Sequence, residues 1–380
     1  MALSSKLPNV GTTIFTVMSA LANEHGAINL SQGFPGYPID PELSELVNQN
    51  MRAGFNQYTP MGGDPGLKRV LSYKHEKLFG KRYNPASEIC VTAGATQGLF
   101  TAITALIHPG DEVILFTPAY DSYIPSIEVN GGVPVVIEMS APNYRIPWDQ
   151  VREKITPRTR MIMINSPHNP TGSVIDQDDL NELAAATRDT DIIVLSDEVY
   201  EHITFDGITH ASVSGHEELA ERSLVVFSFG KTFHVTGWKT GYTLAPSHLM
   251  TEFFKVHQFN VFSCNNPMQK AIAQYMQEEN TYLNLPAFFQ KKRDYFLEGL
   301  KDSRFKIVPA RGTYFQLLDY SAISDEGDVD LAKRWTKEKG IASIPVSVFH
   351  PSGKDEKVLR FCFAKQEDEL AKGIDILRSL

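Results

Sequence analysis

Cysteine is scarce in the sequence, which has only Cys90, Cys264 and Cys362 among 380 residues. Because they are far apart, odd in number and outside any CxxC or Cys/His cluster, they predict neither a disulfide framework nor a metal site. Basic residues are in deficit, and the formal net charge of −9 argues against nucleic acid as a main partner. No apolar run approaches membrane-spanning length, and residues 1–8 lack the apolar core of a signal peptide. We therefore expect a cytoplasmic protein with no metal and with no nucleic-acid or membrane partner.

The glycine motifs of nucleotide-binding proteins are missing as well. The sequence contains no GxGxxG and no GxxxxGK[ST], so neither a dinucleotide site nor a nucleoside triphosphate site is supported. The composition is that of an ordinary globular protein, with 42% hydrophobic and 21% charged residues. At 380 residues the chain is long enough for two domains with large cores.

Short apolar strands alternate with helical segments over most of the chain. Strands that are apolar throughout, without alternation, are typical of a mostly parallel sheet covered by helices on both faces. The predicted strands cover residues 88–92, 111–116, 132–138, 160–165, 191–195 and 224–227, and predicted helices include 14–24, 99–107, 178–188 and one that begins at Pro41. The sequence therefore predicts a large α/β domain.

From about residue 285 the pattern changes to a different mixture of elements. Helices are predicted at 288–300 and 330–339 and at the C-terminus, and strands at 313–319, 341–344 and 358–364. We expect a smaller α+β domain made of residues 1–40 and 285–380, beside a large domain of residues 41–284.

Lys231 is the residue around which the chemistry is predicted. It follows the strand 224–227 in a turn of small and apolar neighbours, with Ser228 before it and Lys239 after it. Partial burial there would lower the pKa of the amine and make it available for Schiff-base chemistry. We infer that Lys231 holds pyridoxal phosphate and that Ser228 and Lys239 hold the phosphate. The alternative is an ordinary loop lysine after a core strand.

Other polar and aromatic residues also follow predicted strands. Ligands collect outside the carboxyl ends of strands in such sheets, where we place Asn169, Asp197, Tyr120 and the turn 94–97. A buried carboxylate at Asp197 would keep the ring nitrogen of the cofactor protonated, although an aspartate there could instead cap the next helix.

The remaining parts of the cofactor need their own partners. Asn169 and Tyr200 can donate to its phenolic oxygen, and the ring of Tyr120 can stack on it. The helix N-terminus near residues 95–97 can bind its phosphate.

Arg360 is embedded among apolar residues of the strand 358–364. A strand arginine can hold a substrate carboxylate bidentately, but a structural ion pair is the alternative. Tyr58, in a polar glycine-rich loop, reads on its own as a surface aromatic residue.

In this order the motifs resemble class I aminotransferases of pyridoxal-phosphate fold type I along nearly the whole chain. The branch of methionine aminotransferases and kynurenine/glutamine transaminase K enzymes looks closest. The motifs are Asn29–Pro35, Asn56–Tyr58, Thr92–Thr96, Pro118–Tyr120, Asn169–Gly172, Ser196–Tyr200, Ser228–Lys231 and Arg360. Each is weak alone, and the ordered set is highly specific.

The resemblance implies a role for each matching residue. Lys231 is implied as the Schiff-base lysine, and Asp197 as the partner of the pyridine nitrogen. Asn169 and Tyr200 are implied as ligands of the phenolic oxygen, and Tyr120 as the stacking ring. The implied phosphate ligands are Ala95, Thr96, Ser228 and Lys239. The implied ligands of the substrate carboxylate are Gly33, Asn169 and Arg360. Tyr58 is implied to reach the phosphate of a neighbouring subunit, so a homodimer with shared active sites is expected. Many relatives carry arginine in place of Lys239, which leaves the geometry of phosphate binding less certain.

The resulting expectation is ping-pong transamination between an amino acid and a 2-oxo acid, with the amine of Lys231 as general base at Cα. The resemblance favours methionine, phenylalanine or kynurenine as amino donor, with Ile14, Phe15, Tyr37 and Tyr58 as pocket walls. A β-lyase acting on cysteine conjugates or cystathionine would use the same Lys231 and Asp197. A non-catalytic, regulator-like binding module on the same fold is disfavoured, because the Gly/Pro loop begins by residue 33 and leaves no room for a helix-turn-helix domain.

Overall fold

A computed structural model describes residues 3–380. Its largest element is a seven-stranded sheet in the order β2-β8-β7-β6-β5-β3-β4. The strands are β2 (Ile89–Thr92), β3 (Glu112–Thr117), β4 (Val133–Glu138), β5 (Thr159–Asn165), β6 (Ile193–Asp197), β7 (Ser223–Ser228) and β8 (Gly241–Leu244). The predicted α/β class and the seven-stranded sheet are confirmed.

The sheet is parallel except at β8. Strands β4, β3, β5, β6 and β7 pair in parallel, whereas β8 runs antiparallel to both β7 and β2. Strands β2, β3 and β6 are buried along their whole length, as their continuous apolar sequences predict. The parallel strands therefore end at one common edge.

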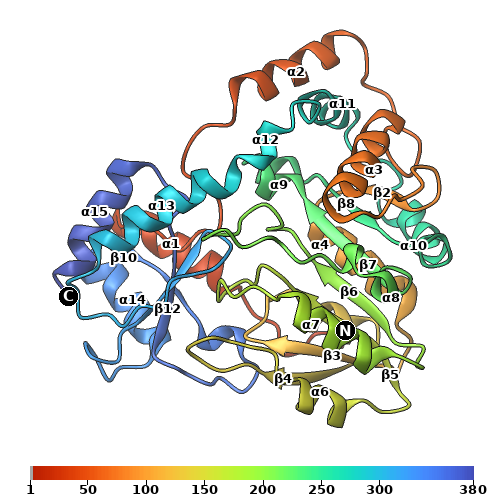
Figure 1. The fold of residues 1–380 in the computed structure, drawn as a ribbon. Helices are drawn as coiled ribbons and strands as arrows, with labels where there is room; N and C mark the ends of the chain where they lie inside the picture. The colour runs from red at the N-terminus through yellow and green to blue at the C-terminus, as the bar shows by residue number, and fades with distance from the viewer. Residues whose placement is uncertain (1–2) are drawn as a thin grey trace.

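Helices pack around this sheet and around the smaller group of strands beside it (Figure 1). The longer ones are α1 (Ile14–His25), α2 (Pro41–Arg52), α3 (Pro65–Phe79), α4 (Ala95–Leu106), α5 (Tyr123–Val129), α6 (Trp148–Lys154), α7 (Gln177–Thr187), α10 (Ser247–Asn260), α11 (Asn266–Tyr275), α13 (Leu285–Gly299), α14 (Asp328–Glu338) and α15 (Glu367–Arg378). The predicted start of α2 is present, because the Asp40 side chain accepts a hydrogen bond from the Glu42 amide, with Pro41 next in the chain. Short helices α8 (Glu217–Ala220), α9 (Phe229–Thr232) and α12 (Asn280–Leu283) lie in the connections.

A second group of strands lies beside the large sheet. Strands β9 (Phe315–Asp319), β11 (Ile344–Pro345) and β12 (Val358–Cys362) form an antiparallel sheet with β12 in the centre. Strand β1 (Ile28–Asn29) pairs in parallel with β10 (Ile341–Ala342), and α1 packs against α14. Figure 1 shows the red α1 among the blue helices near the C-terminus. The two-domain division stays a prediction, and this pairing supports grouping residues 1–40 with residues 285–380.

Two predicted elements differ from the structure. Helix α4 begins at Ala95 rather than Leu99, because the small residues after Gly94 already form its first turn. The predicted strand 341–344 is divided between two sheets, since Ile341 and Ala342 pair with β1 whereas Ile344 pairs with β12. In the described part of the chain, no helix combines the length and apolar character that crossing a membrane requires.

Candidate active site

A cavity of about 140 Å³ lies where β5, β6 and β7 end. Its walls bring together most of the residues predicted for the site, from five separate stretches of chain. These are Ala95, Thr96, Tyr120, Asn169, Asp197, Tyr200, Ser228, Lys231 and Lys239. Gly33 and Arg360 join them by hydrogen bonds, since Nζ of Lys231 donates to the Gly33 carbonyl at 3.0 Å and Arg360 donates to Asn169 Oδ1 at 2.7 Å.

Lys231 lies in the short helix α9, directly after β7, rather than in an irregular turn. Its ammonium nitrogen is 5.6 Å from the ring centre of Tyr200. Burial lowers the pKa of Lys231 to about 8, and the positive charges of Arg360 and Lys239 act in the same direction. The amine is therefore neutral in a much larger fraction of molecules than an exposed lysine would be at the same pH.

Asp197 is the last residue of β6 and is 4% exposed. Its carboxylate accepts a 2.6 Å hydrogen bond from the Tyr123 hydroxyl and a 3.2 Å hydrogen bond from the Val199 amide. Burial raises the pKa of Asp197 to about 6, although these hydrogen bonds and Lys231 lower it. No helix starts at this point, so the alternative of a helix N-cap does not apply.

The N-terminus of α4 faces Lys239. Gly94 is the N-cap of this helix, with φ of 80°, and no side chain caps the first turn. A Cβ atom at Gly94 would lie 3.5 Å from Nζ of Lys239, so the glycine leaves the ammonium close to the helix end. Unpaired amides at a helix N-terminus and a nearby cation together favour a phosphate.

Arg360, on β12, is 1% exposed. One terminal nitrogen donates to Asn169 Oδ1 at 2.7 Å and the other to the Ser31 carbonyl at 3.0 Å, whereas Nε is buried without a hydrogen-bond partner. The ring of Phe315 packs 3.9 Å from the guanidinium carbon and that of Phe15 lies at 5.3 Å. Within residues 3–380 no carboxylate forms an ion pair with Arg360, so the alternative of a structural ion pair does not hold.

None of the four predicted pocket walls, which are Ile14, Phe15, Tyr37 and Tyr58, is among the residues that line this cavity. Tyr37 packs edge-on against His234 and Phe288, with ring centres 4.7 and 5.5 Å away, and its hydroxyl is buried without a partner. Tyr58 is 79% exposed and contacts Phe262 edge-on at 5.4 Å. Within this chain, therefore, Tyr58 is not part of the cavity.

Two tyrosines that the sequence reasoning did not select take part in the site. Tyr123 donates to Asp197, and the Tyr314 hydroxyl donates to the Gly33 carbonyl at 2.6 Å. Tyr123 is three residues after the predicted Tyr120, which is a weak signal. Tyr314 precedes β9, and nothing in its local sequence points to Gly33.

Comparison with known proteins identifies the family. The family model described as aminotransferase class I and II matches residues 25–377. The chain belongs to the class I and II aminotransferases. It is 47% identical to the methionine aminotransferase of Escherichia coli strain K12, over 99% of this chain and 98% of that protein. It is 33% identical to human kynurenine–oxoglutarate transaminase 1, over 92% of this chain and 91% of that protein.

Solved structures of aminotransferases agree with this assignment. The E. coli enzyme whose structure identified a methionine aminotransferase function superimposes with a TM-score of 0.98, at 46% identity and full coverage of both chains. N-succinyldiaminopimelate aminotransferase of Mycobacterium tuberculosis gives a TM-score of 0.95 at 34% identity, again covering both chains fully. The protein is thus a fold type I aminotransferase that depends on pyridoxal phosphate and acts on amino acids and 2-oxo acids.

The residues present fit this cofactor. Asp197 is a buried carboxylate whose pKa is raised by burial, and a protonated pyridine nitrogen would supply the positive charge that it lacks. The uncapped α4 N-terminus, Lys239 and Ser228 line the same cavity and could hold the phosphate of the cofactor. When bound, pyridoxal phosphate supplies an aldehyde that takes up the amino group and a ring that accepts electrons from Cα. Within this cavity, the amine of Lys231 is available to accept or return a proton.

Proposed function

We propose that this aminotransferase takes its amino group from methionine or from another unbranched or aromatic amino acid, and transfers it to a 2-oxo acid in a ping-pong cycle. The environment of Arg360 carries the proposal. Its guanidinium has an unpartnered Nε for the substrate carboxylate, and aromatic rings enclose it. Phe15 and Phe349 have ring centres 5.8 Å apart. Losing hydration against these rings would be costly for a side-chain carboxylate, whereas it would be favourable for a thioether or an aromatic ring.

The name of the similar E. coli protein, methionine aminotransferase, supports this donor, and that of the human relative supports kynurenine as a second one. Gly33 lets its loop pack closely on Phe315, because a Cβ there would lie 2.8 Å from the Phe315 ring. Tyr37, which packs against His234 and Phe288, is part of the proposed wall for the substrate side chain.

The residue roles are part of the same proposal. Lys231 moves the proton between Cα and the cofactor, Asp197 holds the proton on the ring nitrogen, and Asn169 and Tyr200 donate to the phenolic oxygen. Tyr120 stacks on the ring. The phosphate is bound by Ala95, Thr96, Ser228 and Lys239. Gly33, Asn169 and Arg360 bind the substrate carboxylate.

A half-reaction without any oxo acid tests the donor. The absorbance band of the bound cofactor is followed while L-methionine is titrated into purified protein, with L-phenylalanine, L-kynurenine and L-aspartate as comparisons. We expect conversion of the band by the first three at lower concentrations than by aspartate. Conversion by aspartate at the lowest concentration would contradict the donor while leaving the cofactor assignment intact.

A β-lyase with the same cofactor is the second candidate, and the comparisons do not favour it. Incubation with a cysteine conjugate in the absence of an oxo acid distinguishes the two reactions. Elimination would continue to release pyruvate and ammonia, whereas transamination stops after one amino group per active site.

We also propose a homodimer in which Tyr58 completes the partner's phosphate site. The support is the 79% exposure of Tyr58, which contacts Phe262, itself 48% exposed. Phe259, at the end of α10, is 86% exposed, and such exposed aromatic side chains are typical of interaction surfaces. Hybrids of K231A and Y58A subunits test the sharing. In such a hybrid, one site would combine an intact Lys231 with an intact Tyr58, so cofactor retention returns in half of the sites. If the hybrid holds cofactor no better than the parent Y58A dimer, sharing is excluded.

A cytoplasmic location remains our proposal, supported by the three cysteines, all of which are free thiols. Cell fractionation with an antibody against the native protein is the direct measurement.

A further inference from the structure

A second and larger cavity lies behind the wall of the active site. Its volume is about 460 Å³, within the range of small-molecule sites. It lies between residues 139–146 after β4, residues 163–175 around the end of β5, and residues 306–319 that lead into and include β9. Tyr123 and Asn165 line both cavities, so they form part of the partition between them.

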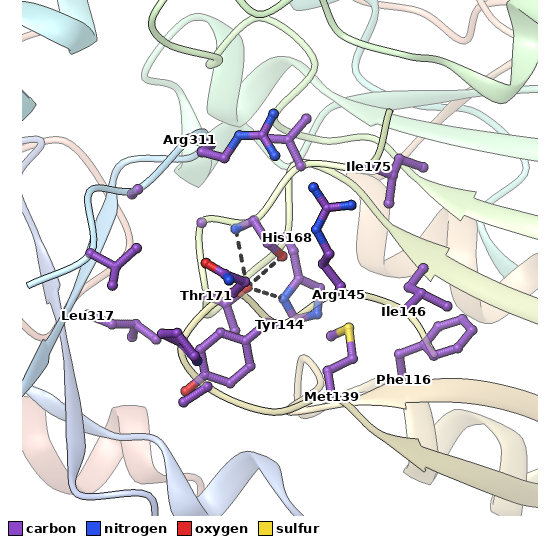
Figure 2. Close-up of a pocket in the computed structure, with 18 of the residues that line it drawn as sticks. Phe116, Met139, Tyr144, Arg145, Ile146, His168, Thr171, Ile175, Arg311 and Leu317 are labelled. Carbon is purple, nitrogen blue, oxygen red and sulfur yellow. Dashed lines mark hydrogen bonds between the residues drawn. The ribbon is translucent and has the colours of Figure 1, made fainter. Parts of the chain in front are cut away.

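The interior of this rear cavity is largely apolar. Phe116, Met139, Ile146, Met163 and Leu317 contribute to the walls. Figure 2 shows Arg311 at the top of the view and Arg145 extending upward, with Phe116, Met139 and Leu317 below both side chains. A ligand that fills the space therefore needs an apolar body.

The acidic side chains of the rear cavity already have partners. Asp179 accepts from Trp148 Nε1 at 2.9 Å, and Glu356 pairs with Lys354 at 2.8 Å. The Asp319 carboxylate accepts from the Ser321 amide at 2.8 Å and lies 3.9 Å from Lys306.

The two arginines differ from these carboxylates. Within residues 3–380, neither the Arg145 nor the Arg311 guanidinium makes a hydrogen bond or an ion pair, and both residues are exposed at the cavity. The negative charge of Asp206 acts on Arg311, but both oxygens of Asp206 are held by Arg293, at 2.6 and 2.7 Å. Arg145 and Arg311 are thus the cations of the cavity lining, within residues 3–380, that have no paired carboxylate.

We propose that the rear cavity is a second binding site, for a small monocarboxylic acid with an aryl or alkyl body. The carboxylate would lie between Arg145 and Arg311, where planar guanidinium groups suit it, and the body would lie against the apolar wall. This site is separate from the substrate site at Arg360 and does not depend on which amino acid the enzyme prefers.

The partition gives such a ligand a route to the active site. Tyr123 donates to Asp197, and Asn165 donates to the Asp197 carbonyl at 2.9 Å while its oxygen accepts from the Asn169 amide at 2.9 Å. A ligand in the rear cavity therefore contacts the two side chains that position Asp197 and Asn169. Its binding changes the environment of the cofactor ring without touching it.

Equilibrium binding of radiolabelled 3-phenylpropionate to the cofactor-loaded enzyme tests the proposal. We expect two molecules per chain, one at Arg360 and one in the rear cavity. The double variant R145A/R311A should lower the affinity for one of the two molecules at least about tenfold and leave the affinity for the other unchanged. The R360A variant should lose the other molecule. The matched control R52A/R378A removes two exposed arginines elsewhere and should bind as the wild type does.

The uncharged 3-phenylpropanamide provides a second comparison, and we expect it to bind the rear cavity at least about tenfold more weakly. No binding, or one molecule per chain that R145A/R311A binds with unchanged affinity, would overturn the proposal, whereas a single molecule that this variant loses would support it. A second molecule that R145A/R311A binds with unchanged affinity would also overturn it. Because both arginines are exposed, these variants are expected to fold, and thermal unfolding verifies it.

Discussion

The Tyr123 hydroxyl donates a 2.6 Å hydrogen bond to Oδ2 of Asp197, linking the start of α5 to the end of β6. Burial and the charge of Asp197 raise the pKa of Tyr123 well above its ordinary value, so the tyrosine remains a donor. Asp197 is thereby oriented, yet burial keeps its own pKa at about 6. Tyr123 and Asp197 are therefore placed so that Asp197 could accept a hydrogen bond from the protonated ring nitrogen of the cofactor.

The first prediction concerns the stability of the cofactor-free protein. The pKa of Asp197 rises from an ordinary 3.8 to about 6, so the folded protein binds more protons than the unfolded chain between these values. Stability from this group is therefore greatest below about pH 4 and is lost as pH rises through 6, by about 3 kcal/mol in total. Urea unfolding from pH 4 to 7 should show this loss in the wild type relative to D197N. The exposed-site control D375N should follow the wild type, and a pH-independent difference between wild type and D197N would contradict the argument.

The second prediction is that Y123F moves to higher pH the range over which ionisation of Asp197 lowers the stability of the folded protein. Losing a hydrogen bond to a charged carboxylate costs about 1.5–3 kcal/mol, which corresponds to about one or two pKa units for Asp197. The measurement is the same urea series on cofactor-free Y123F compared with Y123F/D197N. If the stability of Y123F fell over the same pH range as that of the wild type, the hydroxyl would contribute little to the ionisation of Asp197.

The sequence predicted well which residues lie at the edge of the sheet, because each of them closely follows a predicted strand. Asn169, Asp197 and Lys231 follow short apolar runs that predict buried strands, and the carboxyl ends of parallel strands lie at one edge of the sheet. The chemical role predicted for each position came from the resemblance to the family motifs and not from this geometry.

Contacts between distant segments were not predictable in the same way. Tyr314 reaches Gly33 across 281 positions, and no local pattern marks such a pair. Strand β8 is antiparallel, which a short apolar sequence does not reveal. The rear cavity likewise depends on how residues 306–319 pack against the loops after β4 and β5.

The third prediction concerns the pH dependence of cofactor attachment. Only the neutral amine of Lys231 can react with an aldehyde, and its pKa is about 8 because it is buried. The rate at which added pyridoxal phosphate attaches to the cofactor-free protein should therefore rise with pH and level off above about 8. Stopped-flow absorbance between pH 6 and 10 measures it, with K231A as the control that forms no attachment. A rate still rising steeply at pH 10 would indicate an ordinary exposed lysine.

The fourth prediction separates substrate binding from cofactor binding at Arg360. Lysine cannot reproduce the two donors that Arg360 directs at Asn169 and the Ser31 carbonyl while also leaving Nε for a carboxylate. R360K should therefore lower kcat/KM for L-methionine on the order of 10²-fold, the loss expected for a charge-assisted hydrogen bond, with cofactor affinity little changed. Arg293 offers a matched control, since it is 4% exposed but pairs with Asp206 outside the cavity. R293K should lower thermal stability and leave KM for methionine unchanged. If R360K instead weakened the cofactor and kept KM, Arg360 would belong to the cofactor site and the assignment of the substrate carboxylate would be wrong.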